Sequence, residues 1–236
     1  LIGFTKSVAR EFGSRGITST TGAVFVTAAT NATTQAALKL AGGTTVLAKI
    51  ASGANAPVTI TTDSLSMTAN DSISAGSGTV TLRNRTAGTL INLGGADVLS
   101  GSPLTLGLTD TELDRITADT LVIGRTGATA SGTVTVSSSI SAALAKNLTV
   151  QGGGDIVVNA SQSITTLTNG NLLLNADSDG NGSGAIWLGG SSSISSNGGN
   201  ITLGGGTVGD GSGFALGNAG FAYGVLVDSS ATLAAG

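Results

Sequence analysis

The 236-residue chain contains no cysteine and no histidine. Without cysteine it has no disulfides, no thiolate zinc sites and no cysteine nucleophile. Without histidine it lacks the commonest general base and metal ligand. No Lys follows Lys146, so the many Ser and Thr of the C-terminal part have no neighbouring base to activate them. We therefore predict a non-enzymatic protein with no catalytic residues, no bound metal and no cofactor.

Charged residues are scarce at 10%, aromatic residues at 3%, and there are two prolines. An ordinary globular domain carries about a quarter charged residues. The formal net charge is −3, and every charged residue after Lys146 is acidic. Because a phosphate-binding surface needs clustered cations, this distribution excludes nucleic acid as a partner.

Long apolar runs are also missing. No uninterrupted apolar segment reaches the roughly 18 residues that a membrane-spanning helix requires, so we predict that the chain does not span a membrane. The chain begins with Leu1 and stops at Gly236 within a regular pattern. We therefore expect a fragment that is truncated at its C-terminus, and the lack of a visible signal peptide carries little weight.

Glycine is abundant, with 38 residues, while 40% of residues are hydrophobic and the mean hydropathy is +0.35. Disordered chains combine low hydrophobicity with high net charge, so this composition predicts a folded protein. The clearest pattern lies in 147–203, where short apolar segments begin at 147, 171 and 200, followed by second segments at 156–158 and 186–188. Ser-Ile pairs then recur at 163–164 and 193–194.

Repeats of 20–50 residues are typical of solenoids, because one unit cannot bury its own apolar face. The phrase ANDSISAGSGTVTLRN (69–84) matches SSSISSNGGNITLGG (191–205) more than 100 residues away. We predict an all-β fold, a right-handed parallel β-helix over 19–236, with its handedness taken from the bias of parallel crossovers. An antiparallel β-sandwich is the main alternative.

Further strands are predicted from alternating apolar and polar residues. They cover 22–27, 44–50, 58–61, 64–67, 120–123, 133–136, 214–216 and 225–227. Residues 35–40 are interpreted as a short helical turn or an irregular corner, and 107–119 as a loop or one helical turn.

Residues 1–18, LIGFTKSVAREFGSRGIT, place Ile2, Val8 and Phe12 at helical spacing. The segment resembles the helix that follows the catalytic Tyr-x-x-x-Lys of short-chain dehydrogenases, above all the 3-oxoacyl-carrier-protein reductases. That family's dinucleotide turn and Ser-Tyr-Lys set lie upstream of this segment, so no reductase residue is carried over. We interpret 18/19 as a junction of two unrelated coding sequences; the alternative is an amphipathic helix that caps the solenoid.

Residues 19–236 resemble the repeat region of filamentous-haemagglutinin-like adhesins and autotransporter passengers of bacteria. GLTDTELDRITADTLVIG (107–124) and NGGNITLGG (197–205) carry the resemblance. It implies secretion to the bacterial cell surface, outer-membrane association and a role as a rod or stalk. A host receptor, cell-surface receptor or carbohydrate would be the partner. The alternatives are a β-helical carbohydrate-binding or carbohydrate-active passenger and, third, a non-functional reductase remnant fused to a β-helix.

Four features are weighed as sites, each against a structural interpretation. The segment 177–182 (DSDGNG) resembles the start of an EF-hand loop but is interpreted as a plain β-turn, because Leu188 stands where the bidentate Glu belongs. The segment 204–210 resembles a single calcium-binding nonapeptide and is also interpreted as a turn. Trp187 is interpreted as a packing residue rather than a ligand contact.

The fourth feature is a cluster of charged residues within 104–124, which we call the charged island. Its carboxylates could form a sugar-cleaving pair, with Arg115 and Arg125 nearby, although no aromatic residue is close in sequence. The interpretation favoured here is a solvated loop that could take part in binding. The island's acidic residues are Asp110, Glu112, Asp114 and Asp119.

Overall fold

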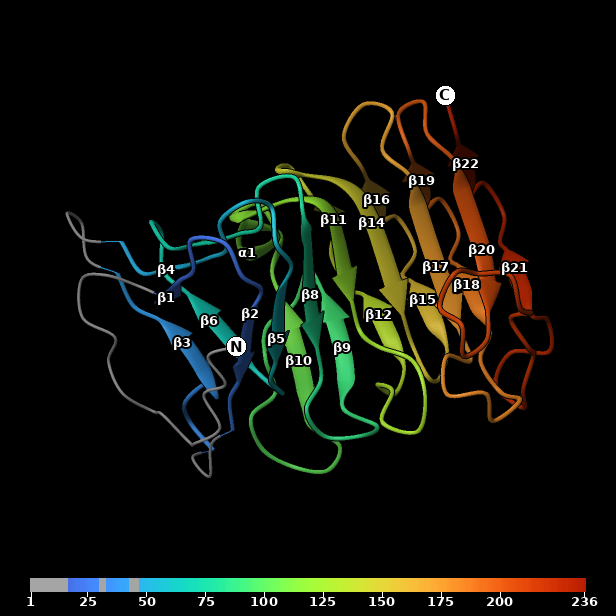
Figure 1. The fold of residues 1–236 in the computed structure, drawn as a ribbon. Helices are drawn as coiled ribbons and strands as arrows, with labels where there is room; N and C mark the ends of the chain where they lie inside the picture. The colour runs from blue at the N-terminus through green and yellow to red at the C-terminus, as the bar shows by residue number, and fades with distance from the viewer. Residues whose placement is uncertain (1–16, 30–32, 43–46) are drawn as a thin grey trace.

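The computed structural model describes residues 17–29, 33–42 and 47–236 (Figure 1). Over these ranges the chain is nearly all β-structure, with one short helix, α1 (Asp110–Leu113). The predicted N-terminal helix falls mainly on residues 1–16, outside the described ranges. Ile17 and Thr18, which were assigned to that helix, form strand β1. No helix in the described part is long and apolar enough to cross a membrane.

The strands lie in four sheets. The ten-stranded sheet contains β1 (Ile17–Thr18), β2 (Val24–Thr27), β4 (Lys49–Ala51), β5 (Val58–Thr61), β7 (Ser72–Ser74), β8 (Thr79–Arg83), β11 (Ile116–Ile123), β14 (Ala145–Gln151), β17 (Leu172–Ala176) and β20 (Ile201–Gly205). The six-stranded sheet contains β9 (Leu90–Leu93), β10 (Thr105–Leu108), β12 (Val134–Val136), β15 (Ile156–Val158), β18 (Ile186–Leu188) and β21 (Val225–Val227). The two smaller sheets contain β13 (Ile140–Ser141), β16 (Ser163–Thr165), β19 (Ser193–Ser195) and β22 (Thr232–Ala234), and β3 (Leu38–Leu40) with β6 (Leu65–Met67).

Every pairing between these strands is parallel. In the C-terminal half the chain returns to the same sheet three strands later: β14 pairs with β17, β15 with β18 and β16 with β19. We call one such passage through three sheets a circuit. Within the described ranges antiparallel contacts are limited to isolated bridges. The hairpins that a β-sandwich needs are therefore not formed there, and the pairing is compatible with the predicted parallel β-helix.

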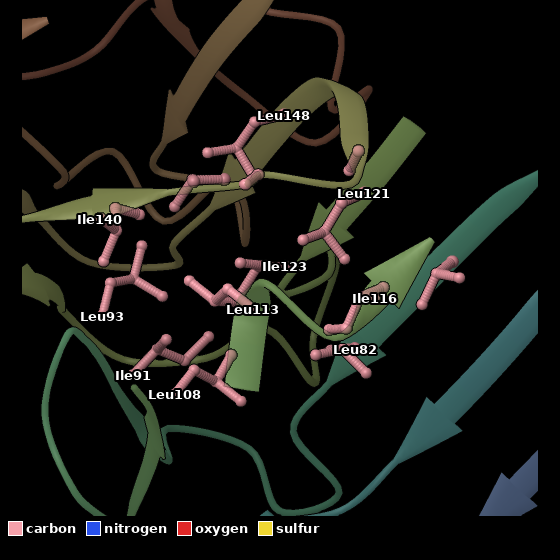
Figure 2. Packing of buried hydrophobic residues seen from close by; sticks show 14 of the residues in the cluster. Leu82, Ile91, Leu93, Leu108, Leu113, Ile116, Leu121, Ile123, Ile140 and Leu148 are labelled. Atoms are coloured by element: carbon pink, nitrogen blue, oxygen red, sulfur yellow. The ribbon is translucent and has the colours of Figure 1, made fainter. Parts of the chain in front are cut away.

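Apolar side chains stack in register from circuit to circuit. In the ten-stranded sheet, one such ladder runs through Val24, Val58, Val80, Leu121, Leu148, Leu172 and Ile201. In the six-stranded sheet, another runs through Leu106, Ile91, Val134, Ile156, Ile186 and Val225. Because parallel strands lie about 4.8 Å apart, equivalent side chains of successive circuits touch. Figure 2 shows Leu82, Ile123 and Leu148 gathered in this interior with Leu113 of α1.

The repeated sequence segments form corresponding strands, as predicted. The Ser-Ile-Ser triplets form β7 and β19, and each is followed by a five-residue strand, β8 and β20. Ile164 and Ile194, from the two Ser-Ile pairs, are register partners in β16 and β19.

Two predictions about single segments were wrong, and strands outside the predicted segments also form. Residues 35–40 contain strand β3 rather than the predicted helical turn or irregular corner, because Leu38 and Leu40 pair with β6. Residues 214–216 form no strand; Leu216 makes an isolated bridge to Gly184 within a long loop. The chain also forms β9 and β10, which were not predicted, and β10 pairs with the side of β9 that is turned away from β12.

Candidate functional site

The charged island begins with α1, which lies between β10 and β11. Thr109 caps the helix: its hydroxyl accepts a hydrogen bond from the Glu112 N–H, while Glu112 accepts one from the Thr109 N–H at 3.1 Å. This reciprocal arrangement is a capping box. Leu113 is fully buried and points into the core (Figure 2). Of the loop or single helical turn predicted at 107–119, a helical turn forms at 110–113 and is anchored to the core at Leu113, whereas 107–108 and 116–119 belong to β10 and β11.

The carboxylates of the island do not converge on one point. Asp110 accepts a hydrogen bond from the Ser141 N–H at 2.6 Å, and Asp114 accepts one from the Ala143 N–H at 3.1 Å. Asp119 is exposed and accepts from the Asn147 amide at 3.1 Å. Two of these acids thus accept from backbone donors in or beside β13, which within the described ranges pairs with a strand, β16, on one side only.

The remaining charged side chains of the island form hydrogen bonds with the backbone at the edge of β6. Glu112 accepts a hydrogen bond from the Met67 N–H at 3.1 Å, and Arg115 donates one to the Met67 carbonyl at 2.9 Å. Asp97, which the sequence analysis did not single out, bridges two strands by accepting from the Leu65 N–H (3.1 Å) and the Gly107 N–H (2.8 Å). Side chains therefore replace a neighbouring strand between β6 and β10. The island is therefore not a freely solvated loop. We call the hydrogen-bonded contact that Asp97, Glu112 and Arg115 make between β6, β10 and α1 the seam.

This use of carboxylates is general. Within the described part, eleven acidic side chains accept at least one backbone N–H: Asp63, Asp71, Asp97, Asp110, Glu112, Asp114, Asp155, Asp177, Asp179, Asp210 and Asp228. Charged hydrogen bonds of this kind are stronger than neutral ones. Nearly all acids of the described ranges therefore accept hydrogen bonds from the backbone.

Asp97 makes the seam sensitive to pH. Burial raises the pKa of Asp97 to about 7, assisted by the charge of Glu112 and opposed by the hydrogen bonds from Gly107 and Leu65. The unfolded value is about 3.9, so between pH 4 and 7 the folded state holds a proton that the unfolded state has lost. Stability should therefore fall as pH rises through this window, by about 1.4 kcal/mol for each unit of pKa difference.

We expect the melting temperature to decrease from pH 5 to pH 8 and Asp97→Asn to flatten that decrease. The amide cannot ionise, although it also weakens the seam, so the slope with pH is the informative quantity. Thermal unfolding by circular dichroism at four pH values would measure it, with the exposed Asp119→Asn as control. An unchanged slope in Asp97→Asn would contradict the assignment.

The segment 177–182 is closed by its own side chains. Buried Asp177 accepts hydrogen bonds from the Gly182 N–H (3.0 Å) and the Ser183 N–H (3.3 Å). Asp179 accepts from the Asn181 N–H at 3.2 Å and from its amide at 2.9 Å. The described residues include no cluster of three or more side chains suited to a metal ion. The geometry is that of the predicted turn.

The segment 204–210 opens a long loop, 206–224, which joins β20 to β21 and which we call the strap. It crosses the outer face of earlier circuits. Asn175 is fully buried beneath it, accepting from the Gly211 N–H at 3.2 Å and donating to the Gly206 carbonyl at 2.9 Å. Gln151, one circuit further back, donates to the Gly209 carbonyl at 3.2 Å.

Aromatic residues of the strap face in two directions. Phe221 packs on Trp187 with ring centroids 5.3 Å apart, which agrees with the packing role expected for Trp187. Phe214 and Tyr223 are 82% and 64% exposed. Exposed large apolar side chains that cluster on one element are typical of interaction sites. The strap is therefore the part of the described surface best suited to contact a partner.

Next to the strap lies a groove of about 460 Å³. Gly and Ala residues from three circuits form much of its lining. Its polar side chains are Ser131, Thr133, Asp155, Asp179, Asn181, Ser183 and Asn218. Asp155 accepts hydrogen bonds from the Ala185 N–H at 2.8 Å and from the Asn218 amide at 2.7 Å. Sequence reasoning missed this groove, although the acid-containing turns at 155 and 179 recur at equivalent places in the repeat.

Comparison with protein-family models, curated proteins and solved structures gave no match.

Proposed function

We propose that this chain is a right-handed parallel β-helix that serves as a rod or stalk segment of a secreted bacterial surface adhesin, without enzymatic activity. The observation that carries the proposal is the unbroken register of the apolar ladders, from Val24 to Ile201 in one sheet and from Leu106 to Val225 in another. Right-handedness follows from the strong bias of parallel crossovers. Solenoids of this kind build length from repeated units.

The distribution of charge supports a mechanical rather than a chemical role. General acid–base catalysis needs carboxyl groups that face a substrate. Here three of the island's four carboxylates, those of Asp110, Glu112 and Asp114, accept from backbone donors in or beside β6 and β13. The same commitment argues against loop 107–119 as the binding element. We therefore assign partner contact to the strap, through Phe214 and Tyr223.

Adhesion can be tested with beads coated at equal density and washed over cultured epithelial cells. We expect the protein to retain beads, and the double variant Phe214→Ala/Tyr223→Ala to lower retention several-fold. Phe25→Ala, which removes an exposed aromatic residue at the other end of the stack, is the matched control. Retention no better than that of albumin-coated beads would contradict the adhesin proposal. Release of reducing ends from polysaccharides would contradict the non-enzymatic part.

A second candidate function is carbohydrate binding in the groove beside the strap. Its carboxylate, amide and hydroxyl groups can accept and donate hydrogen bonds to sugar hydroxyls, and ligand sites combine such groups with a concave surface. The third hypothesis, a reductase remnant, rests on residues 1–18 alone.

The carbohydrate candidate predicts that the protein binds particular glycans on an array and that Asn181→Ala weakens this binding about ten-fold or more. Asn181 lines the groove and is exposed, so its replacement should leave the fold intact. Thr168→Ala, an exposed polar position outside the groove lining, serves as control. Glycan binding that is equal in both variants would exclude the groove as the site.

A further inference from the structure

Three of the ten Lys and Arg residues of the chain gather at the corner between the ten-stranded and six-stranded sheets. Arg83 is the last residue of β8, and Arg85 follows in the turn that leads to β9. Arg125 comes two residues after β11, the strand that pairs with β8 (Figure 1). The turns after β8 and β11 therefore lie in neighbouring circuits. We call these three residues the arginine cluster.

The fully buried Asn84 holds the two turns together. Its amide donates to the Thr86 carbonyl at 2.7 Å within its own turn, and to the Thr129 carbonyl at 3.0 Å in the turn after β11. Arg125 donates from Nε to the same Thr129 carbonyl at 2.8 Å. The guanidinium group of Arg125 is thus held close to Asn84, whose two chain neighbours are the other arginines of the cluster.

The guanidinium groups are fixed through Nε and leave their outer nitrogens unused. Arg83 donates from Nε to the Thr61 hydroxyl at 2.9 Å, and the Nε atom of Arg85 lies 3.6 Å from the Asp63 carboxylate. Within the described ranges, no Nη atom of the three arginines donates a hydrogen bond to the protein. Such paired donors match the oxygens of a carboxylate or a phosphate group. The cluster therefore presents free donors of a kind that recognises oxoanions.

The cluster also lacks enough negative charge of its own. Asp63 contacts it, but the Asp63 oxygens already accept from two N–H groups and two hydroxyls. Three positive charges and one negative charge leave a formal excess of two positive charges. Burial and the charge of Arg83 lower the pKa of Arg125, and Asp63 opposes them. A bound oxoanion would offset the repulsion between these arginines.

The groove beside the strap indicates what carries the oxoanion. The two turns of the cluster contribute Ala87 and Ala128 to its lining, while later circuits contribute Asp155 and Asp179. Those carboxylates accept hydrogen bonds from neutral sugars but repel a ligand that is negatively charged along its whole length. The groove therefore favours a ligand whose negative charge is confined to the end beside the cluster.

We propose that the arginine cluster binds a carboxylate or phosphate group carried by one sugar of an otherwise neutral glycan, whose neutral sugars lie along the groove. This inference rests on the carbohydrate candidate above and names the class of glycan that the groove would take.

A glycan array printed in matched pairs tests the proposal. Each neutral glycan stands beside the same glycan with one carboxylate or one phosphate group, and the two acidic forms show which oxoanion the cluster takes. We expect about ten-fold tighter binding of the acidic member, because charged hydrogen bonds are added to the contacts of the neutral one. Equal binding of both members in every pair, with Asn181→Ala weakening both, would overturn this inference and leave the carbohydrate candidate in place. Absence of glycan binding would overturn both.

The variant Arg83→Gln/Arg125→Gln should remove the preference for the acidic member and leave binding of the neutral member unchanged. Arg83→Lys/Arg125→Lys keeps the charge but loses the forked donors, so most of the preference should also disappear. Lys49→Gln/Lys146→Gln is the control, because it removes the same charge at two exposed positions outside the cluster. Circular dichroism would verify that each variant folds. A preference that survives Arg83→Gln/Arg125→Gln would overturn the proposal, as would equally tight binding of fully sulfated dextran.

Discussion

Replacing Asp63 with alanine should lower the free energy of unfolding by about 3 kcal/mol, because it removes the shared acceptor of four hydrogen bonds, one of which is fully buried. Asp63 is buried and accepts hydrogen bonds from the N–H groups of Arg85 and Thr86, each at 2.8 Å. Its carboxylate also accepts from the hydroxyls of Thr86 and Thr89. Arg85, 3.6 Å away, is half-exposed and contributes little.

Urea unfolding followed by circular dichroism would measure the effect. The control is Asp210→Ala, where an exposed carboxylate accepts from its near neighbour Ser212; we expect a change within about 0.5 kcal/mol. Equal losses in the two variants would mean that burial and the number of donors do not set the contribution of a carboxylate. Asp63→Asn should fall between wild type and alanine, because one carbonyl oxygen remains.

Asp63 also shapes the response to acid. Burial works to raise its pKa, but the hydrogen bonds from Thr86, Arg85 and Thr89 outweigh burial and lower it. The pKa of Asp71 is lowered in the same way, by donors on Thr68, Ala48 and Gly42. A depressed pKa contributes stability that is present above about pH 4 and is lost as pH falls. Since Asp97 acts in the opposite sense between pH 4 and 7, we expect maximum stability within that interval, toward its acidic side.

The second large effect is expected in the core. Leu148 is 1% exposed and lies in the ladder between Leu121 and Leu172. Leu148→Ala removes contacts to both neighbours and leaves a cavity, because the adjacent circuits are held in register by backbone hydrogen bonds and cannot close around it. Replacements of this kind lower the free energy of unfolding by about 2–5 kcal/mol.

Leu144→Ala is the matched control for Leu148→Ala, four residues earlier and largely exposed at a corner. It should change the free energy of unfolding by less than about 0.5 kcal/mol. The same urea titration serves for both variants. Comparable destabilisation by the two substitutions would contradict the inward orientation of Leu148.

The sequence predicted the regular part of the fold because each circuit repeats the same local pattern. Strand segments at 156–158 and 186–188 coincide with β15 and β18, since alternation of apolar residues decides which side faces the core. Leu38 and Leu40 were missed because two apolar positions around one lysine give too short a pattern. Residues 214–216 were wrong for the opposite reason: Phe214 and Leu216 alternate like a strand but belong to the strap.

The site could be predicted only in part. The charged island was visible as charge in an uncharged chain, and its helical turn followed from the local sequence. The partners of its side chains were not predictable, because Glu112 meets Met67 and Asp110 meets Ser141, in other circuits. Which circuits are adjacent there depends on β10, an extra strand that interrupts the repeat. The groove likewise combines turns that are distant in sequence.

Unpaired strand edges also bear on the sign of the net charge. Backbone N–H donors that lack a strand partner at Leu65, Met67 and Ser141 donate to carboxylates instead. A carboxylate can accept several such donors at once, whereas an ammonium or guanidinium group can accept none. Acids therefore stand at interruptions of the sheets, where they complete the hydrogen bonding of the backbone. The isoelectric point near 4.7 partly reflects this use of carboxylates.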